Sequence, residues 1–269
     1  MLGVKIFELK SEEPQFQNLF NTGSAMQAVF LKQVHDKNPL LFEKLHSESK
    51  LRPYTVSVPF RIKDKICWKI TSLNEQVSEF LENCLFEHIF LEKENIKFTP
   101  LLVKSEFISY KDFYGKFFLD KSTFKKHISL YFISPTSFKS LESKFYVPFP
   151  LPRLIFQSLI NKWSSFASFV DVNDATIVDY IEKHIAITNY SLDTYKFLID
   201  KGFITGFKGK CSIHIKSSDY FAKLVNMLIF YGYFSGIGIK TAMGMGQITL
   251  DKVNNFLFST NSIFEEIGL

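Results

Sequence analysis

The chain has 269 residues, of which 46% are hydrophobic and 22% charged; this is the composition of a folded globular protein and excludes a disordered one. Its length suits one large domain or two of ordinary size. No run of eighteen uninterrupted apolar residues and no signal-peptide pattern occurs, so we expect no membrane span. Three cysteines without metal-site spacing predict a reducing cytoplasmic location and no disulfide framework.

The formal net charge of +5 is concentrated in one segment. Residues 201–240 hold six lysines against one acid, Asp219. Such a basic segment favours a polyanionic partner, with a solvated lysine face as the alternative. The basic residues include only three arginines, and in so lysine-rich a chain each guanidinium favours two-point recognition of phosphate. They are Arg52, Arg61 and Arg153.

Apolar periodicity predicts alternating strands and helices in the first half of the chain. The predicted elements are a strand over 4–9, a helix around 26–34, a short helix from Pro39 to His46 capped by Asn38, strands over 54–60 and 66–70, a helix capped by Asn74 with an apolar stripe to Leu85, and a strand between 96 and 108.

The second half repeats this order without a residue-level repeat. Its predicted elements are a strand over 127–133, a helix with a stripe from Phe156 to Trp163, strands over 186–197 and 203–215, a helix over 218–231 and a strand over 247–250. The order predicts an α+β protein of two tandem ferredoxin-like (RRM-like, βαββαβ) domains. We place them at residues 1–123 and 124–269, with the break near 121–126.

The segment 236–246 carries the strongest functional signal, because four glycines surround one cation and one hydroxyl. These residues are Gly236, Gly238, Lys240, Thr241, Gly244 and Gly246. Glycine backbone lets a partner approach closely, and N–H groups beside a lysine suit the binding of a phosphate chain. The spacing fits neither the dinucleotide fingerprint nor the P-loop. A glycine-rich hairpin or helix C-cap is the alternative interpretation.

The pattern Gly-x-Gly-x-Lys-Thr-x-Met-Gly-x-Gly before a final strand resembles the signature of the CRISPR-associated endoribonucleases of the Cas-six family. Further segments resemble the family in the same order. They are Leu45-His46 followed by 53–57, the strand end at 133–138, the helix start at 150–156 with Trp163, and 202–209. The resemblance implies two ferredoxin-like domains side by side, which agrees with the element order.

The resemblance also implies that the protein cuts CRISPR repeat RNA without a metal or other cofactor. The ribose 2′-OH would attack the adjacent phosphate and leave a 2′,3′-cyclic phosphate and a 5′-OH. This chemistry requires a base, an acid and positive charge near the phosphorane. His46 matches the family's catalytic histidine, and its place at a helix C-terminus favours a cation. Its role as acid or as base stays open, and a solvent-facing histidine is the alternative.

Two positions depart from the family pattern. Leu31 falls where the family often has a tyrosine, and it cannot transfer a proton. Arg52, with Lys50 beside it, falls at the family's lysine, and arginine is a poor proton donor but a good partner for phosphorane charge. We therefore expect catalysis centred on His46, with Arg52 or Lys50 supplying charge. His35, at the end of the preceding helix, is a candidate for the second proton transfer.

The remaining RNA-binding candidates are basic residues of the second half, namely Arg153, Lys208, Lys210, His214 and Lys216. The expected partner is CRISPR repeat RNA, and partnership with effector-complex proteins and homodimer formation stay open. One alternative function is a catalytically inactive subunit that holds repeat RNA in an effector complex. Another is a small-molecule enzyme that binds a nucleotide phosphate at the glycine segment, although the βαβ dinucleotide pattern is missing.

Overall fold

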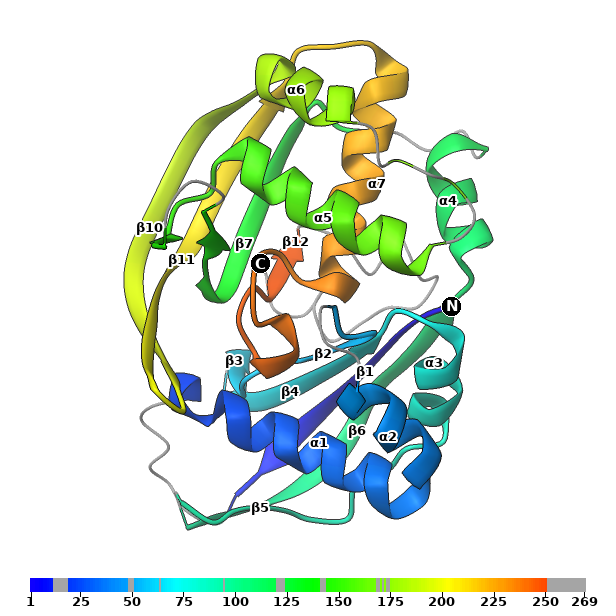
Figure 1. Ribbon diagram of the computed structural model, residues 1–269, viewed down its shortest axis with the longest axis vertical. Helices are drawn as coiled ribbons and strands as arrows, with labels where there is room; N and C mark the ends of the chain where they lie inside the picture. The colour runs from blue at the N-terminus through cyan, green and yellow to red at the C-terminus, as the bar shows by residue number, and fades with distance from the viewer. Residues whose placement is uncertain are drawn as a thin grey trace.

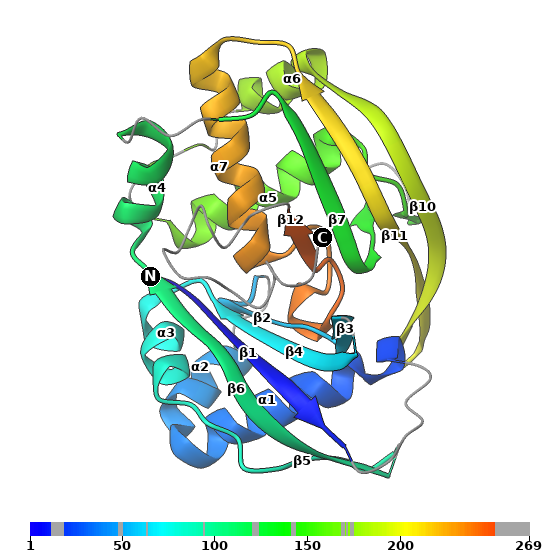
Figure 2. The same cartoon turned by 180° about the vertical axis from the view of Figure 1, so that it is seen from behind.

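The computed structural model describes residues 1–11, 19–47, 51–62, 64–93, 95–119, 124–140, 144–167, 170, 172 and 175–250. The molecule has two main antiparallel sheets, one in each half and each with its own helices (Figures 1 and 2). No helix among these residues is long and apolar enough to cross a membrane.

The first sheet contains strands from the first half of the chain, in the order β2-β4-β1-β6-β5, with β3 paired to β4. Its strands are β1 (Leu2–Lys10), β2 (Tyr54–Val56), β3 (Phe60–Ile62), β4 (Lys65–Ser72), β5 (Ile89–Leu91) and β6 (Ile96–Ile108). The helices of this half are α1 (Gly23–Lys37), α2 (Pro39–Ser47), α3 (Glu75–Glu82) and α4 (Tyr110–Phe118), with a 3₁₀ turn, η1 (Leu19–Thr22), before α1.

Both faces of the first sheet are buried. Phe7, Trp68 and Ile70 point into a core with α1, α2 and α3, whereas Val4 and Cys67 lie in a second core shared with the other half of the chain. Because successive residues of a strand point to opposite faces, a strand buried on both sides loses the usual polar alternation. This explains why β1 is buried along nearly its whole length.

The second sheet has the order β10-β11-β7-β12. Its strands are β7 (His127–Thr136), β10 (Ile185–Ile199), β11 (Gly202–Ile215) and β12 (Ile248–Leu250), and β8 (Phe138–Lys139) and β9 (Tyr146–Val147) form a separate hairpin. The helices are α5 (Pro152–Phe166), α6 (Ala175–His184) and α7 (Asp219–Ser235), followed by the 3₁₀ turn η2 (Thr241–Met243).

The two sheets share one topology. In each, the first strand of the βαββαβ unit lies between the third and the fourth, and the second strand lies outside the third. The predicted ferredoxin-like class is thereby confirmed for both halves. The predicted boundary at 123/124 adjoins residues 120–123, which lie outside the described residues, so the division into domains stays a prediction.

Several local predictions hold and others need correction. Asn38 and Asn74 cap α2 and α3, because their Oδ1 atoms accept hydrogen bonds from Leu41 N at 3.0 Å and Val77 N at 2.9 Å. The helix at Asn74 ends at Glu82, so Leu85 lies outside it. The predicted strand over 54–60 is divided into β2 and β3, which meet β4 on either side of Pro59, a residue without a backbone N–H.

Helix α7 connects the two halves. It packs against α4, α5 and β12, and its C-terminal end also contacts β1, β2 and β4 (Figure 1). The core that contains α7 is continuous from Val4 of β1 to Leu130 of β7 and Trp163 of α5. The position of the C-terminal end of α7 is therefore fixed by both sheets.

Candidate functional site

The helix pair α1–α2 positions His46. The stripe Met26, Phe30 and Val34 buries one side of α1, and Leu41 and Leu45 bury one side of α2. His46 follows Leu45 directly, so its side chain leaves the buried stripe and is exposed in the last turn of α2. The predicted placement of this histidine at a helix C-terminus is therefore found in the structure.

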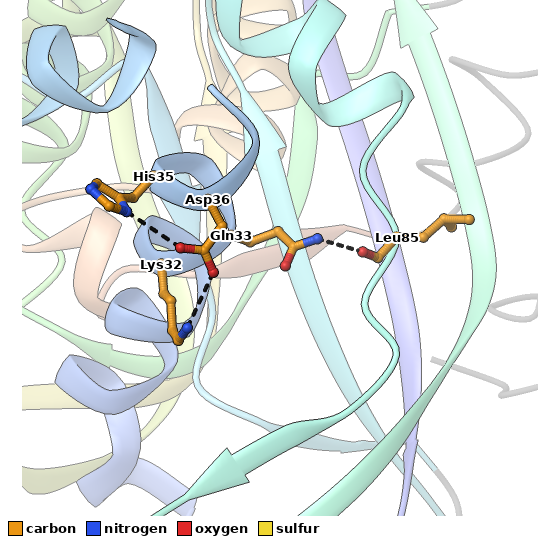
Figure 3. A network of polar contacts seen from close by, with 5 residues as sticks. All are labelled: Lys32, Gln33, His35, Asp36 and Leu85. Carbon is orange, nitrogen blue, oxygen red and sulfur yellow. Dashed lines mark hydrogen bonds and ion pairs between the residues drawn. The ribbon is translucent and has the colours of Figure 1, made fainter. Parts of the chain in front are cut away.

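Phe42 contacts both candidate histidines. Its ring centroid lies 5.0 Å from that of His35 and 5.7 Å from that of His46. His35 Nδ1 lies 3.3 Å from Asp36 Oδ1, and Lys32 Nζ donates to Asp36 Oδ2 at 3.1 Å (Figure 3). The hydrogen bonds from Lys32 and His35 lower the pKa of the Asp36 carboxyl. Within the described part of the chain, we find no direct contact between the two imidazoles.

Figure 3 also shows how this end of α1 is anchored. Gln33 Nε2 donates to the backbone oxygen of Leu85 at 2.8 Å, on the side of the helix away from His35. Leu85 follows α3, so the end of α1 is tied to the segment between α3 and β5. His35 therefore stands on an anchored helix, bonded to an exposed carboxylate.

Arg52 is hydrogen-bonded to the C-terminal end of α2. Its Nη1 donates to the backbone oxygen of Leu45, and the guanidinium is half-buried. A cation at this place satisfies a carbonyl that the helix leaves unpaired and offsets the negative end of the helix dipole. The Arg52 guanidinium thus contacts the residue that directly precedes His46. Lys50, the neighbouring candidate, lies outside the described residues, and Leu31 is half-buried against the core of the first half.

The glycine segment 236–246 descends from α7 to the first half of the chain (Figure 1). Gly244 forms a parallel bridge with Ser57, just after β2. At the start of α1, a Cβ on Gly23 would stand 2.1 Å from the backbone oxygen of Met243. The end of the segment therefore packs on α1 and β2, the same elements that flank the His46 helix. The predicted phosphate-binding segment and the helix that carries the predicted catalytic histidine are therefore both adjacent to α1 and β2, which we call the common frame.

All four glycines are required by the backbone. Each has a positive φ, between +62° and +100°, and a Cβ at any of them would come within 3.0 Å of another atom. At Gly246 that atom is the oxygen of Ile237, at 2.0 Å, and at Gly238 it is the oxygen of Ser137, at 2.4 Å. The segment therefore folds back closely on itself and on the end of β7.

Most N–H groups of the glycine segment already have acceptors inside the protein. These donors are Gly236 N to Gly232 O, Ile237 N to Gly246 O, Gly238 N to Ser158 Oγ, Ile239 N to Ser137 O, Met243 N and Met245 N to Lys240 O, and Gly246 N to Pro135 O. A phosphate bound here would therefore depend on the exposed Lys240 and the half-buried Thr241 more than on the N–H groups of the glycines. Lys240 itself has the left-handed conformation, with φ 54°.

The other RNA-binding candidates lie on the second half in two groups. Lys208 and Lys210 stand on one face of β11, with their Nζ atoms 5.7 Å from the Tyr195 ring centroid and 5.3 Å from that of Tyr131. His214 stacks on His127 at 4.1 Å between centroids. Lys216 is exposed just after the strand. This face combines cations with aromatic rings.

Arg153 is engaged in ion pairs. In the first turn of α5, its Nη1 lies 3.0 Å from Asp179 Oδ1 and 2.8 Å from Glu182 Oε2, both on α6. An RNA phosphate would have to compete with these two carboxylates. Sequence reasoning treated Arg153 as a phosphate contact because it could not place the acids of α6 opposite it.

Two buried lysines near the glycine segment were missed from the sequence. Lys162 on α5 and Lys69 on β4 are buried, and burial lowers the pKa of each to about 7. Lys162 lies within the predicted helix, directly before the last residue of its apolar stripe, and Lys69 alternates with apolar neighbours in a predicted strand. Neither pattern distinguishes a buried lysine from an exposed one, and only the position of Lys162 next to Trp163 could have indicated burial.

Comparison with known proteins gives consistent relatives. The sequence model of the CRISPR-associated endoribonuclease Cas6 family matches residues 130–248. A Cas6 of Streptococcus thermophilus is 38% identical over 126 residues, which are 47% of this chain and 51% of that protein. A Cas6 of Mycobacterium tuberculosis is 27% identical over 202 residues, 74% of this chain and 63% of that protein. The chain thus spans about half to two thirds of the length of the curated relatives it matches.

Solved structures extend the similarity of fold to nearly the whole chain. A Thermus thermophilus Cas6 aligns with a TM-score of 0.70 at 22% identity, covering 93% of this chain and 98% of that one. A Cas6 product complex aligns with a TM-score of 0.72, also at 22% identity, covering 93% and 100%. The sequence match over residues 130–248 and this common fold agree with the motifs 53–57 and 236–246, and together they make the chain similar to Cas6 proteins.

Proposed function

We propose that the protein is a metal-independent endoribonuclease that binds CRISPR repeat RNA and cuts precursor transcripts into guide RNAs. The observation that carries the proposal is the common frame of α1 and β2, on which the glycine segment packs and from which α2 presents the exposed His46. An RNA strand held at Lys240 would have its ribose-phosphate backbone on the side of the molecule that holds the α1–α2 pair.

In the proposed reaction the 2′-OH of the scissile nucleotide loses its proton and attacks the adjacent phosphorus. The bond from phosphorus to the 5′-oxygen breaks, and that oxygen gains a proton. The products are a 2′,3′-cyclic phosphate and a 5′-OH. His46 performs one of the two proton transfers, which is worth about 10²–10⁴-fold in rate. Arg52 or Lys50 supplies the positive charge that stabilises the phosphorane.

Cleavage of labelled repeat RNA in EDTA tests this function. Wild-type protein should produce one 5′-OH fragment and one cyclic-phosphate fragment, and His46→Ala should lower the single-turnover rate by about 10²–10⁴-fold while RNA binding is kept. A 2′-deoxy nucleotide at the scissile position should abolish the reaction. Equal rates for His46→Ala and wild type would refute the role of His46, and loss of cleavage in EDTA would refute metal independence.

The second candidate function is a catalytically inactive subunit that holds repeat RNA. Leu31 at the expected tyrosine position favours it, because leucine cannot transfer a proton. The hydrogen bond of Arg52 to the end of α2 favours it too, because it occupies a guanidinium that would otherwise face the phosphorane. Tight binding of repeat RNA without turnover by the wild-type protein would select this function over the first.

A further inference from the structure

The glycine segment follows the wrong end of a helix for binding phosphate. Helix N-termini attract anions, because their free N–H groups and the helix dipole are positive. The segment 236–246 instead follows the C-terminus of α7, where Gly236 is the C-cap residue. The last carbonyl oxygens of a helix lack intrahelical partners and carry the negative end of the dipole. Left uncompensated, this end would repel RNA phosphates.

Two buried ammonium groups compensate the carbonyls at this place. Lys162 Nζ donates to the oxygens of Ser235 at 3.1 Å, Gly236 at 2.9 Å and Gly238 at 3.2 Å. Lys69 Nζ donates to the oxygen of Tyr233 at 3.0 Å and lies 4.5 Å from the ring centroid of Tyr233. One lysine comes from α5 and the other from β4, so both halves of the chain contribute a charge.

Neutral groups would have been enough to satisfy these oxygens. The intervening carbonyl of Phe234 accepts from Thr71 Oγ1 at 2.6 Å and from Thr55 Oγ1 at 3.3 Å, without any charge. Burying an ammonium group costs far more than burying a hydroxyl, because the ion loses its hydration. Two lysines beside two threonines at one helix end therefore indicate that the charge itself has a use.

We propose that Lys69 and Lys162 reverse the electrostatic sign of the α7 C-terminus, so that the glycine segment attracts RNA phosphate without either lysine touching the RNA. This inference rests on the proposed function and extends it, because it names the source of attraction at a segment whose N–H groups are mostly bonded internally. Lys240 then supplies the direct contact, and the two buried ammonium groups are positioning residues behind it.

The test measures the affinity of repeat RNA that carries a 2′-deoxy scissile nucleotide, at pH 6.0, where both ammonium groups keep their protons. Lys162→Met and Lys69→Met should each raise the Kd by about tenfold, as expected for one unscreened charge near a phosphate. Single-turnover cleavage of intact RNA at saturating protein should stay within about twofold of wild type, because neither lysine takes part in the chemistry.

The chain offers a matched control in Lys5. Its buried Nζ donates to the oxygens of Glu82 at 2.8 Å and Cys84 at 2.9 Å, at the C-terminal end of α3. Lys5→Met therefore removes a buried ammonium group from another helix C-terminus, away from the glycine segment, and should leave the Kd unchanged. An equal rise of the Kd in Lys5→Met, or an unchanged Kd in both Lys69→Met and Lys162→Met, would overturn the proposal.

Hydrogen exchange separates electrostatics from loss of structure. In both variants, protection of the Gly238, Ile239 and Gly246 amides should match wild type. If this protection is lost in Lys162→Met, the Kd of Lys69→Met decides the test, because Lys69 bonds the oxygen of Tyr233, which precedes the glycine segment. A merely structural role would lower the fraction of protein able to bind but not the Kd of that fraction. Wild-type binding without cleavage would count against the proposed enzyme alone, whereas absence of wild-type binding would overturn both proposals.

Discussion

The C-terminal ends of α7 and α2 make an instructive pair, since each is followed by a predicted functional element. At α7, two lysines and two threonines satisfy four consecutive carbonyls, and the surrounding residues are buried. At α2, Arg52 bonds one carbonyl and His46 is exposed. The comparison indicates that the glycine segment, our proposed RNA-binding segment, is fixed in the free protein, whereas the exposed His46 keeps side-chain freedom that a bound substrate would restrict.

The largest expected effect on stability would come from disturbing the glycine segment that follows the C-terminal end of α7. Gly246→Ala places a Cβ 2.0 Å from the oxygen of Ile237 at a φ of +68°, so we expect the free energy of unfolding to fall by about 3–5 kcal/mol. Gly202→Ala is the control, since its φ is +122° but no atom lies within 4 Å; there we expect a loss of about 1–2 kcal/mol. Chemical denaturation measures both, and equal losses would contradict the close packing of the segment.

A smaller effect is expected in the pH dependence of the free energy of unfolding, because the two ammonium groups are buried. Burial lowers the pKa of Lys69 and of Lys162 from 10.5 to about 7. Above pH 7 the unfolded chain then binds more protons than the folded one, so the free energy of unfolding should rise with pH by about 1.4 kcal/mol per pH unit for each lysine. Below pH 7 both states are protonated and this rise disappears.

The measurement compares wild type with Lys162→Met between pH 7 and 8.5. This window lies below the ionisation of the thiols, since burial raises the pKa of Cys67, Cys84 and Cys211 to about 11 in the folded state from an ordinary value of 9.0. The variant should show a shallower slope of unfolding free energy against pH. Parallel slopes would mean that Lys162 keeps its proton throughout the window, held by its three carbonyl acceptors.

The difference between contacts of neighbouring residues and contacts of residues far apart in the chain explains what the sequence could predict. Patterns set by local chemistry were readable: the Asn38 and Asn74 caps, the existence of strand β4 and the order βαββαβ all follow from neighbouring residues. The positions missed depend on residues far apart in the chain. Lys162 and Gly236 are brought together by the packing of α5 on α7, and Arg153 meets Asp179 only because α6 lies beside α5.

Short or isolated elements were also beyond the sequence. Helices α4 and α6, strand β5 and the β8–β9 hairpin had no prediction, because short apolar runs fit several structures equally well. The internal bonding of the glycine segment was equally hidden. Four glycines suggest an open backbone, but only the fold shows what fills the space that their missing Cβ atoms leave. At Gly238 and Gly244 it is the residues that follow β7 and β2, and at Gly236 and Gly246 it is the segment itself.

The smallest effect is expected at His35, which lies near the exposed C-terminal end of α2. Phe42 contacts the rings of both His35 and His46, and the hydrogen-bond partner of His35 is Asp36. Because a phenylalanine ring transfers no proton, His35→Ala should change the single-turnover cleavage rate by less than about threefold across pH 5–9. Asp36→Asn is the matched control, since it removes the charge that faces His35 and keeps the ring. A loss greater than tenfold in His35→Ala, with one limb of the pH–rate profile missing, would instead make His35 the second proton-transfer group, and the exposed end of the site would then hold two working histidines.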